Sequence, residues 1–178
     1  LKGLHLVTIS TGQHKEMLKM VLPFFEITTD IKLSIMVPGQ TLSELLAAAI
    51  RKLDGVIQRL PAFDVVIGQG DTTTALAASL VAATNKIPFL HVEAGLRSYD
   101  TDNPFPEENN RVLISHAAAW HLAPTRQARD NLLREGIASN KILVTGNTVV
   151  DAVYWARRKI ARHDVRERIS ASLKRRGL

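Results

Sequence analysis

The sequence contains no cysteine and no long apolar run, and these two absences narrow the classes of protein to which it can belong. Without cysteine the chain can form neither a disulfide nor a thiolate metal site. No hydrophobic stretch approaches the roughly 20 residues that span a bilayer, and the first residues carry no signal-peptide pattern. We therefore expect a cytoplasmic protein that has no membrane partner.

The positive charge of the chain is concentrated at its C-terminal end. The formal net charge is +6, but the segment from Trp155 onward holds nine lysines and arginines against Asp164 and Glu167, so the remainder is close to neutral. This segment has neither the interleaved aromatics nor the recognisable module of a nucleic-acid-binding protein. We expect residues 156–178 to form a basic helical tail or linker, and we predict no nucleic-acid partner.

Short apolar runs alternate with longer amphipathic stretches through the rest of the chain, which is long enough for one substantial core. The runs read as strands and the stretches as helices. The predicted strands are 4–9, 32–36, 64–68, 88–93, 120–123 and 142–145, and the predicted helices are 42–60, 73–84, 107–119, 127–135 and 148–160. Several runs are apolar on both faces, as in a parallel sheet covered on both sides. Residues 1–155 are therefore predicted to form a Rossmann-like α/β domain.

Three loops of this domain follow the carboxyl ends of predicted strands. They comprise residues 68–74, 95–106 and 145–148. In an open parallel sheet these ends lie along one edge, where ligands bind. We therefore expect a single crevice lined by the three loops.

Glu93 is the most informative residue in these loops. It ends the run that begins at Pro88, at a position where an apolar residue is expected. A carboxylate placed there is partly desolvated and needs a partner or a raised pKa. It serves either as a general acid or base or in a salt bridge with Arg97 or Arg111. His91 lies on the same side of the strand, and we expect it to be a hydrogen-bonded core histidine.

The loop after the third predicted strand and the start of the helix at 107 hold further candidates. Asp71 is a helix cap or a catalytic carboxylate, and Thr72 caps the helix or donates to an anion at its N-terminus. Glu107 and Arg111 are four residues apart on one helical face. Asn147 lies in a second turn of the anion-facing kind. No two histidines have the spacing of metal ligands, so we expect no metal.

Taken in order, eight segments of the chain are similar to the non-hydrolysing UDP-N-acetylglucosamine 2-epimerases. The similarity runs from about residue 4 to 160, and the ordered set is more specific than any single motif. The segments are Ser10-Thr-Gly-Gln-His-Lys-Glu-Met-Leu, Val37-Pro-Gly-Gln, Gly70-Asp-Thr-Thr-Thr, His91-Val-Glu-Ala-Gly-Leu-Arg-Ser, Pro104-Phe-Pro-Glu-Glu-Asn-Asn-Arg, Ala123-Pro-Thr, Asn131-Leu-Leu-Arg-Glu-Gly and Val144-Thr-Gly-Asn-Thr-Val-Val-Asp-Ala.

The resemblance implies one half of a B-type glycosyltransferase architecture, in which a UDP-sugar lies between two Rossmann-like domains. It implies interconversion of UDP-N-acetylglucosamine and UDP-N-acetylmannosamine, by elimination of UDP to 2-acetamidoglucal and its re-addition, without a cofactor. It also implies a homodimer for the intact protein. Position by position, the catalytic carboxylates are Asp71, Glu93 and Glu107. The substrate-binding residues are Gln69, where the family commonly has histidine, Thr72, Arg111 and Asn147.

Two parts of the family pattern have no counterpart in this sequence. One is an opening strand with a Gly-Thr-Arg-Pro-Glu loop, which the resemblance places between the strands at 4–9 and 64–68. The other is the second domain with a Thr-x-His-Arg-x-Glu-Asn segment. Because departure of UDP needs cationic partners, we expect this chain alone to be inactive. The alternatives are a truncated or relic domain without catalysis, and a fragment of a B-type glycosyltransferase, which the combination of three carboxylates disfavours.

Overall fold

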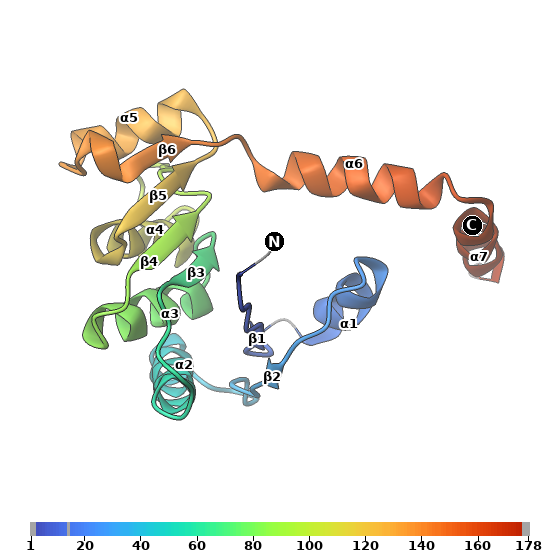
Figure 1. Ribbon diagram of the computed structural model, residues 1–178, viewed down its shortest axis with the longest axis horizontal. Coiled ribbons are helices and arrows are strands. Elements are labelled where there is room, and N and C mark those ends of the chain that lie inside the picture. Colours follow the sequence, from blue (N-terminus) through green and yellow to red (C-terminus); the bar gives the residue numbers. More distant parts are fainter. Residues whose placement is uncertain (1–2, 14, 176–178) are drawn as a thin grey trace. The chain divides into compact units, whose positions relative to one another are not determined.

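The computed structural model describes residues 3–13 and 15–175 and has the expected α/β architecture (Figure 1). The chain divides into two compact units, of which the first ends at Gly146 and the second begins at Asn147. The domain limit expected after residue 155 falls inside helix α6 (Thr148–Ile160). The assignment of domains on either side of that limit stays a prediction.

A four-stranded parallel sheet forms the centre of the first unit. The strands pair in the order β3-β4-β5-β6, and all three pairs are parallel. The strands are β3 (Val66–Gln69), β4 (Phe89–Val92), β5 (Trp120–Ala123) and β6 (Ile142–Val144), and the helices that connect them are α3 (Thr73–Thr84), α4 (Glu107–Ala117) and α5 (Arg126–Arg134). The prediction of a parallel sheet with connecting helices is confirmed.

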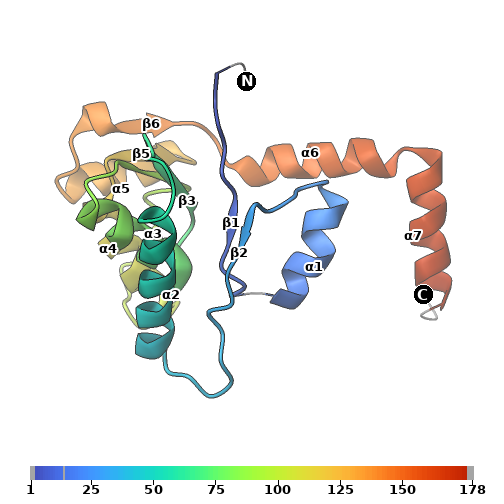
Figure 2. The same cartoon turned by 60° about the horizontal axis from the view of Figure 1, so that its bottom comes forward.

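Helix α3 packs between two other helices. Seven of its twelve residues are buried, which is typical of a helix that is apolar on nearly every side. It contacts α2 (Leu42–Ile57) on one side and α4 on the other, and Figure 2 shows the three helices together. The first core cluster consists of Ile35, Leu45, Ala49, Leu53, Ala77 and Val81, and the second of Ala75, Leu76, Ala82, Phe89, Ile114 and Ala118.

A glycine in β3 makes room for the largest side chain of the second cluster. A Cβ atom on Gly68 would lie 2.5 Å from the ring of Phe89, which is 1% exposed. The two residues belong to neighbouring strands, so any larger residue at position 68 would displace the ring. This close approach places β3 against the core immediately before the first of the three predicted loops.

A second, smaller sheet precedes α2 in the chain. Strand β1 (Ile9–Ser10) pairs in parallel with β2 (Ile31–Lys32), and helix α1 (Lys15–Phe24) connects them. Both strands are shorter than predicted, because the pairing covers only two residues of each. Helix α1 is absent from the sequence-based prediction, which had assigned no structure between residues 9 and 32. The helix has only ten residues and contains Pro23 near its end, so the apolar periodicity that indicates a helix extends over few residues.

Strands β1 and β3 belong to different sheets. Within residues 3–13 and 15–175 no strand connects them, at the position where the family resemblance implies an additional strand. Their carboxyl ends are nevertheless held near each other through Thr74 at the start of α3. The Thr74 hydroxyl lies 3.2 Å from the Thr11 hydroxyl and donates to Oε1 of Gln13 at 2.5 Å.

The second unit consists of two helices. Helix α6 begins after Asn147, whose side chain accepts a hydrogen bond from the Val149 amide at 2.9 Å. Its predicted limits, 148–160, are confirmed, and α7 (His163–Arg175) occupies most of the predicted basic tail. No residue of α6 is buried, and the ammonium group of Lys159 lies 4.8 Å from the centroid of the Trp155 ring. Among the described residues, no helix is long and apolar enough to cross a bilayer.

Candidate functional site

The carboxyl ends of the sheet strands bring the three predicted loops to one edge. The amide of Gly70 donates to Val92 at 3.0 Å, that of Ala94 to Leu122 at 3.0 Å, and that of Thr145 to Ala123 at 2.9 Å. These bonds continue the parallel ladder one step past each strand. The loops at 68–74 and 95–106 therefore follow neighbouring strands, and the loop at 145–148 starts at the same edge beyond β5. A single crevice lined by all three stays a prediction.

Asp71 is held at this edge by helix α4. Its carboxylate accepts two hydrogen bonds from Arg111, from Nη2 at 2.5 Å and from Nε at 3.1 Å. Its backbone carbonyl accepts from the Asn110 side chain at 2.8 Å. The Asp71 side chain is 26% exposed, so the ion pair remains open to solvent on one side. Arg111 thus lies against one candidate carboxylate, and its contact with a substrate stays a prediction.

Glu93 follows β4 in a left-handed backbone conformation, with φ of +66°. Such a conformation costs on the order of 1 kcal/mol or more in a residue other than glycine, and it is concentrated at functional sites. The carboxylate of Glu93 lies over Gly70, because a Cβ atom on that glycine would be 3.8 Å from Oε2. Glu93 is thereby placed beside the residue that precedes Asp71.

The two arginines named as structural partners for Glu93 form ion pairs elsewhere. Arg97 pairs with Glu135 at 2.6 Å, and Arg111 pairs with Asp71 and Glu108. The acid–base role of Glu93 stays a prediction.

Glu107 is the first residue of α4 and precedes Arg111 by one turn. It is partly exposed, and the positive end of the helix dipole favours a carboxylate at this position. The same turns of α4 carry Asn110 and Arg111 to Asp71. Helix α4 therefore connects Glu107 to the group formed by Asp71 and Arg111.

The remaining candidates have local structural roles. Gln69 ends β3 and is exposed, and Thr72 caps α3 by accepting a hydrogen bond from the Ala75 amide at 3.2 Å. Asn147 caps α6 in the second unit. Contact of these three residues with a substrate stays a prediction. Among the described residues, no cluster of histidines and carboxylates has the arrangement of a metal site.

Glu108 is a buried residue beside the candidate site to which the sequence analysis gave no role. It is 2% exposed, and its carboxylate accepts hydrogen bonds from the amides of Ser98 and Tyr99, both at 3.0 Å, and from Arg111 at 3.2 Å. Burial raises the pKa of this carboxyl, but the hydrogen bonds and the guanidinium outweigh burial, so the pKa lies below its usual value. The Glu-Glu pair at the helix start was visible in the sequence, but only tertiary contacts distinguish its two members.

The loop at 95–106 is anchored on α5 as well. Arg97 has a fully buried side chain and donates two hydrogen bonds to Glu135, each at 2.6 Å. Asn131 accepts from the Tyr99 hydroxyl and donates to the carbonyl of Gly95. The loop is therefore fixed by polar contacts at both its beginning and its middle.

His91 supports the site from within the sheet. It is 1% exposed, and its Nε2 donates to the carbonyl of Gly70 at 2.8 Å, whereas Nδ1 has no partner among the described residues. Burial lowers the pKa of His91 to about 4, with a smaller contribution from His121 on the neighbouring strand. The imidazole is therefore neutral at pH 7 and holds the loop that carries Asp71. The expectation of a hydrogen-bonded core histidine is confirmed.

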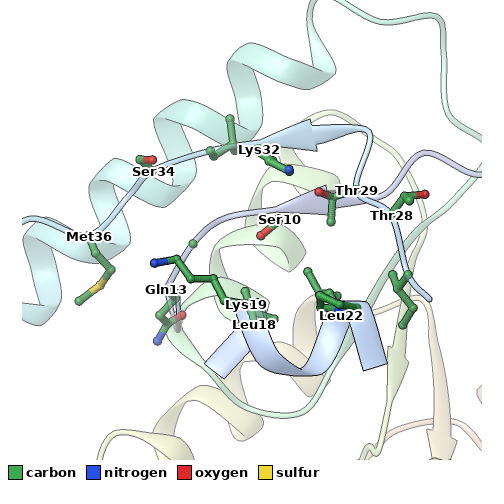
Figure 3. Close-up of a pocket in the computed structure, with 14 residues that line it drawn as sticks. Ser10, Gln13, Leu18, Lys19, Leu22, Thr28, Thr29, Lys32, Ser34 and Met36 are labelled. Atoms are coloured by element: carbon green, nitrogen blue, oxygen red, sulfur yellow. The ribbon is translucent and has the colours of Figure 1, made fainter. Parts of the chain in front are cut away.

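A cavity of about 1100 Å³ lies elsewhere in the first unit, between α1 and the two strands of the small sheet (Figure 3). Leu18 and Leu22 reach into it from α1, and Leu33 and Met36 line it from the segment that includes and follows β2. None of the three candidate carboxylates lines this cavity. It is therefore separate from the carboxylate group at the sheet edge.

Comparison with known proteins finds similarity to the UDP-N-acetylglucosamine 2-epimerases along nearly the whole chain. Residues 2–177 match the family model described as UDP-N-acetylglucosamine 2-epimerase. The UDP-N-acetylglucosamine 2-epimerase of Escherichia coli K12 is 47% identical over 154 residues, which are 86% of this chain and 41% of the relative.

Two solved structures share the fold. The UDP-GlcNAc 2-epimerase of Neisseria meningitidis, bound to UDP-GlcNAc, has a TM-score of 0.86 and 43% identity, over 94% of this chain and 46% of that one. The enzyme of Methanocaldococcus jannaschii, in complex with UDP-GlcNAc and UDP, has a TM-score of 0.82 and 39% identity, over 92% and 45%. The chain thus spans less than half the length of these relatives. It belongs to the UDP-N-acetylglucosamine 2-epimerase family.

Proposed function

We propose that this chain carries the proton-transfer side of an active site that interconverts UDP-N-acetylglucosamine and UDP-N-acetylmannosamine. The observation that carries the proposal is the grouping at one sheet edge of Asp71, Glu93 and the first turns of α4 with Arg111. Family membership supports this substrate class. Because the chain covers about 41% of a curated relative, the activity is proposed for a protein that contains it.

The reaction needs carboxyl groups on both faces of the sugar. In the elimination, a carboxylate takes the C2 proton, the C1–O bond breaks with its electron pair going to UDP, and a C1–C2 double bond forms. In the return step, the UDP oxygen attacks C1 while a carboxylic acid delivers a proton to the opposite face of C2. We assign these steps to Asp71, Glu93 and Glu107 as a group. The route transfers no hydride, so it requires no redox cofactor.

The electrostatics of the group fit this use. Neighbouring carboxylates shift one another's pKa values, which allows one to act as an acid while another acts as a base. Arg111 donates two hydrogen bonds to one oxygen of the Asp71 carboxylate, Oδ2, so the position of Asp71 is defined before substrate arrives. Because Arg111 and Arg97 are already paired with carboxylates, the cations that stabilise departing UDP must come from other groups. We therefore expect no turnover from the isolated chain.

A chimera tests the proposal directly. Residues 4–160 of this chain replace the matching segment of the Escherichia coli relative, and the product is incubated with UDP-N-acetylglucosamine in D₂O. We expect the manno epimer with deuterium at C2, detected by NMR. Asp71→Asn, Glu93→Gln and Glu107→Gln should each lower the rate on the order of a hundredfold or more.

The matched control is Asp130→Asn, since Asp130 is an exposed carboxylate paired only with its neighbour Arg129 among the described contacts. It should leave the rate unchanged. A folded chimera without epimerisation would favour the non-catalytic domain, and retention of activity in the three carboxylate variants would refute the assigned roles. A homodimer for the intact protein and a cytoplasmic location stay predictions, of which sedimentation tests the first.

A further inference from the structure

Glu108 is a buried carboxylate that the proposed proton transfer does not use. Its three donors come from two parts of the chain: the Ser98 and Tyr99 amides from the loop at 95–106, and the Arg111 guanidinium from α4 itself. Burying a carboxylate is costly unless it is fully hydrogen-bonded, so this set of donors accounts for its stability at 2% exposure. The Glu108 carboxylate therefore connects the loop at 95–106, through Ser98 and Tyr99, to the first turn of α4.

The same carboxylate also fixes one end of the Arg111 guanidinium. Nη1 of Arg111 donates to Glu108 at 3.2 Å, while Nη2 and Nε donate to Asp71. A guanidinium is planar and rigid, so two carboxylates on different edges define its orientation completely. Without Glu108, Arg111 would keep one carboxylate partner and could rotate about it.

We propose that Glu108 is a positioning residue that links the conformation of the loop at 95–106 to the orientation of Arg111, and thereby of Asp71. A displaced loop would remove the two amide donors, weaken the hold of Glu108, and loosen the Arg111–Asp71 pair. The catalytic meaning of this link rests on the proposed function, because Asp71 matters to the reaction only there. The link itself is a property of this chain.

The beginning of the loop provides an internal control. Arg97 is held by Glu135 and Ser115. The Ser115 hydroxyl also donates to the backbone carbonyl of Arg111 at 2.8 Å, but within the described ranges no hydrogen bond or ion pair joins Glu135 to Arg111 or Ser115 to the Arg111 guanidinium. Glu135→Gln therefore removes a partly exposed carboxylate that pairs with the same loop, and leaves the side-chain contacts among Glu108, Arg111 and Asp71 in place. It separates a general loosening of the loop from a specific effect on Arg111.

The experiment measures hydrogen exchange by ¹⁵N NMR in the purified 178-residue chain, with Glu108→Gln as the test variant. We expect the Ser98 and Tyr99 amides and the Arg111 Nε–H to exchange faster by on the order of tenfold or more, because hydrogen bonds to a charged acceptor are lost. The Arg97 Nε–H should be unchanged. In Glu135→Gln the pattern should reverse, with Arg97 affected and Arg111 unchanged.

If Glu108→Gln does not fold, Glu108→Asp keeps the charge but shortens the reach, and the same signals are measured. Faster loop exchange with an unchanged Arg111 Nε–H in the folded variant overturns the proposal. Equal acceleration at Arg97 and Arg111 overturns it as well, because it would reflect general loosening. No sugar nucleotide is present, so the outcome is independent of the chimera: an inactive chimera with this exchange pattern would refute the proposed function alone.

Discussion

His91 is neutral in the folded chain at pH 7, and this makes the stability of the fold around the candidate site depend on pH. Within the part of the chain that the structure describes, Nδ1 has no hydrogen-bond partner, and the ring is buried, so a second proton has no favourable place. Its Nε2–H, in contrast, holds the carbonyl of Gly70, next to Asp71. The same residue therefore supports the loop that carries Asp71 and makes the stability of that loop sensitive to acid.

We predict that stability falls between pH 6.5 and about 4. The folded-state pKa of His91, about 4, lies below the unfolded value of 6.5, so the unfolded chain binds more protons in this window. The stabilisation that comes from keeping His91 neutral is fully present above pH 6.5 and is lost as the pH falls to about 4. The free energy of unfolding should fall by about 3 kcal/mol across this window. Urea unfolding at several pH values measures it.

His91→Gln is the comparison variant, since its amide can donate to Gly70 but does not titrate. Its free energy of unfolding should depend less steeply on pH in the same window. Some dependence should remain, because burial also lowers the pKa of His121. Equal slopes in the two proteins would contradict the prediction.

At the scale of secondary structure elements, Gly95 determines how closely the loop after β4 approaches α5. A Cβ atom at this position would lie 2.2 Å from the carbonyl oxygen of Ala128, and the backbone φ is +87°. The obstacle is a helix backbone, which cannot move aside as a side chain can. Gly136, at the end of α5, has a similar φ of +84° but open space around it.

Gly95→Ala should therefore destabilise the chain by several kcal/mol, since it combines backbone strain with a steric clash. Gly136→Ala should cost only the strain, about 1 kcal/mol. Thermal unfolding of the two variants beside the wild type gives both values. Similar losses in the two variants would show that the approach to α5 is not tight in solution.

The elements also show what the sequence could predict. Helices α3 and α6 were predicted to the residue, because a capping side chain, Thr72 or Asn147, marks each start. Parallel topology correctly placed Asp71 and Glu93 at one edge. The partner of Arg97 and the burial of Glu108 could not be predicted, because both depend on contacts between segments distant in the sequence. Helix α1 was missed because it is short and contains Pro23.

At the scale of the whole molecule, the two units differ in how they are stabilised. The first has two buried core clusters, whereas α6 in the second has no buried residue and exposes Val149, Val153 and Tyr154 by more than half. Helix α6 thus gains little from burial of its own apolar surface. The stability of the first unit should therefore depend little on the second.

We predict that a chain ending at Gly146 unfolds with a Tm within about 2 °C of the full chain, which corresponds to less than about 1 kcal/mol. The removed segment contributes no buried residue of α6, so little apolar surface returns to water. Differential scanning calorimetry of both proteins measures the shift. A decrease of Tm well beyond this range would show that the helices of the second unit support the first.

The chain has two tryptophans, and the structure places one in each unit. Trp120 lies in β5 and is 46% exposed, whereas the indole of Trp155 in α6 lies beneath the ammonium group of Lys159. Each unit therefore has its own fluorescent reporter. In Trp120→Phe only Trp155 of α6 emits, and in Trp155→Phe only Trp120 of the sheet emits. The order in which the two units unfold can therefore be measured from native tryptophan fluorescence, without an added label.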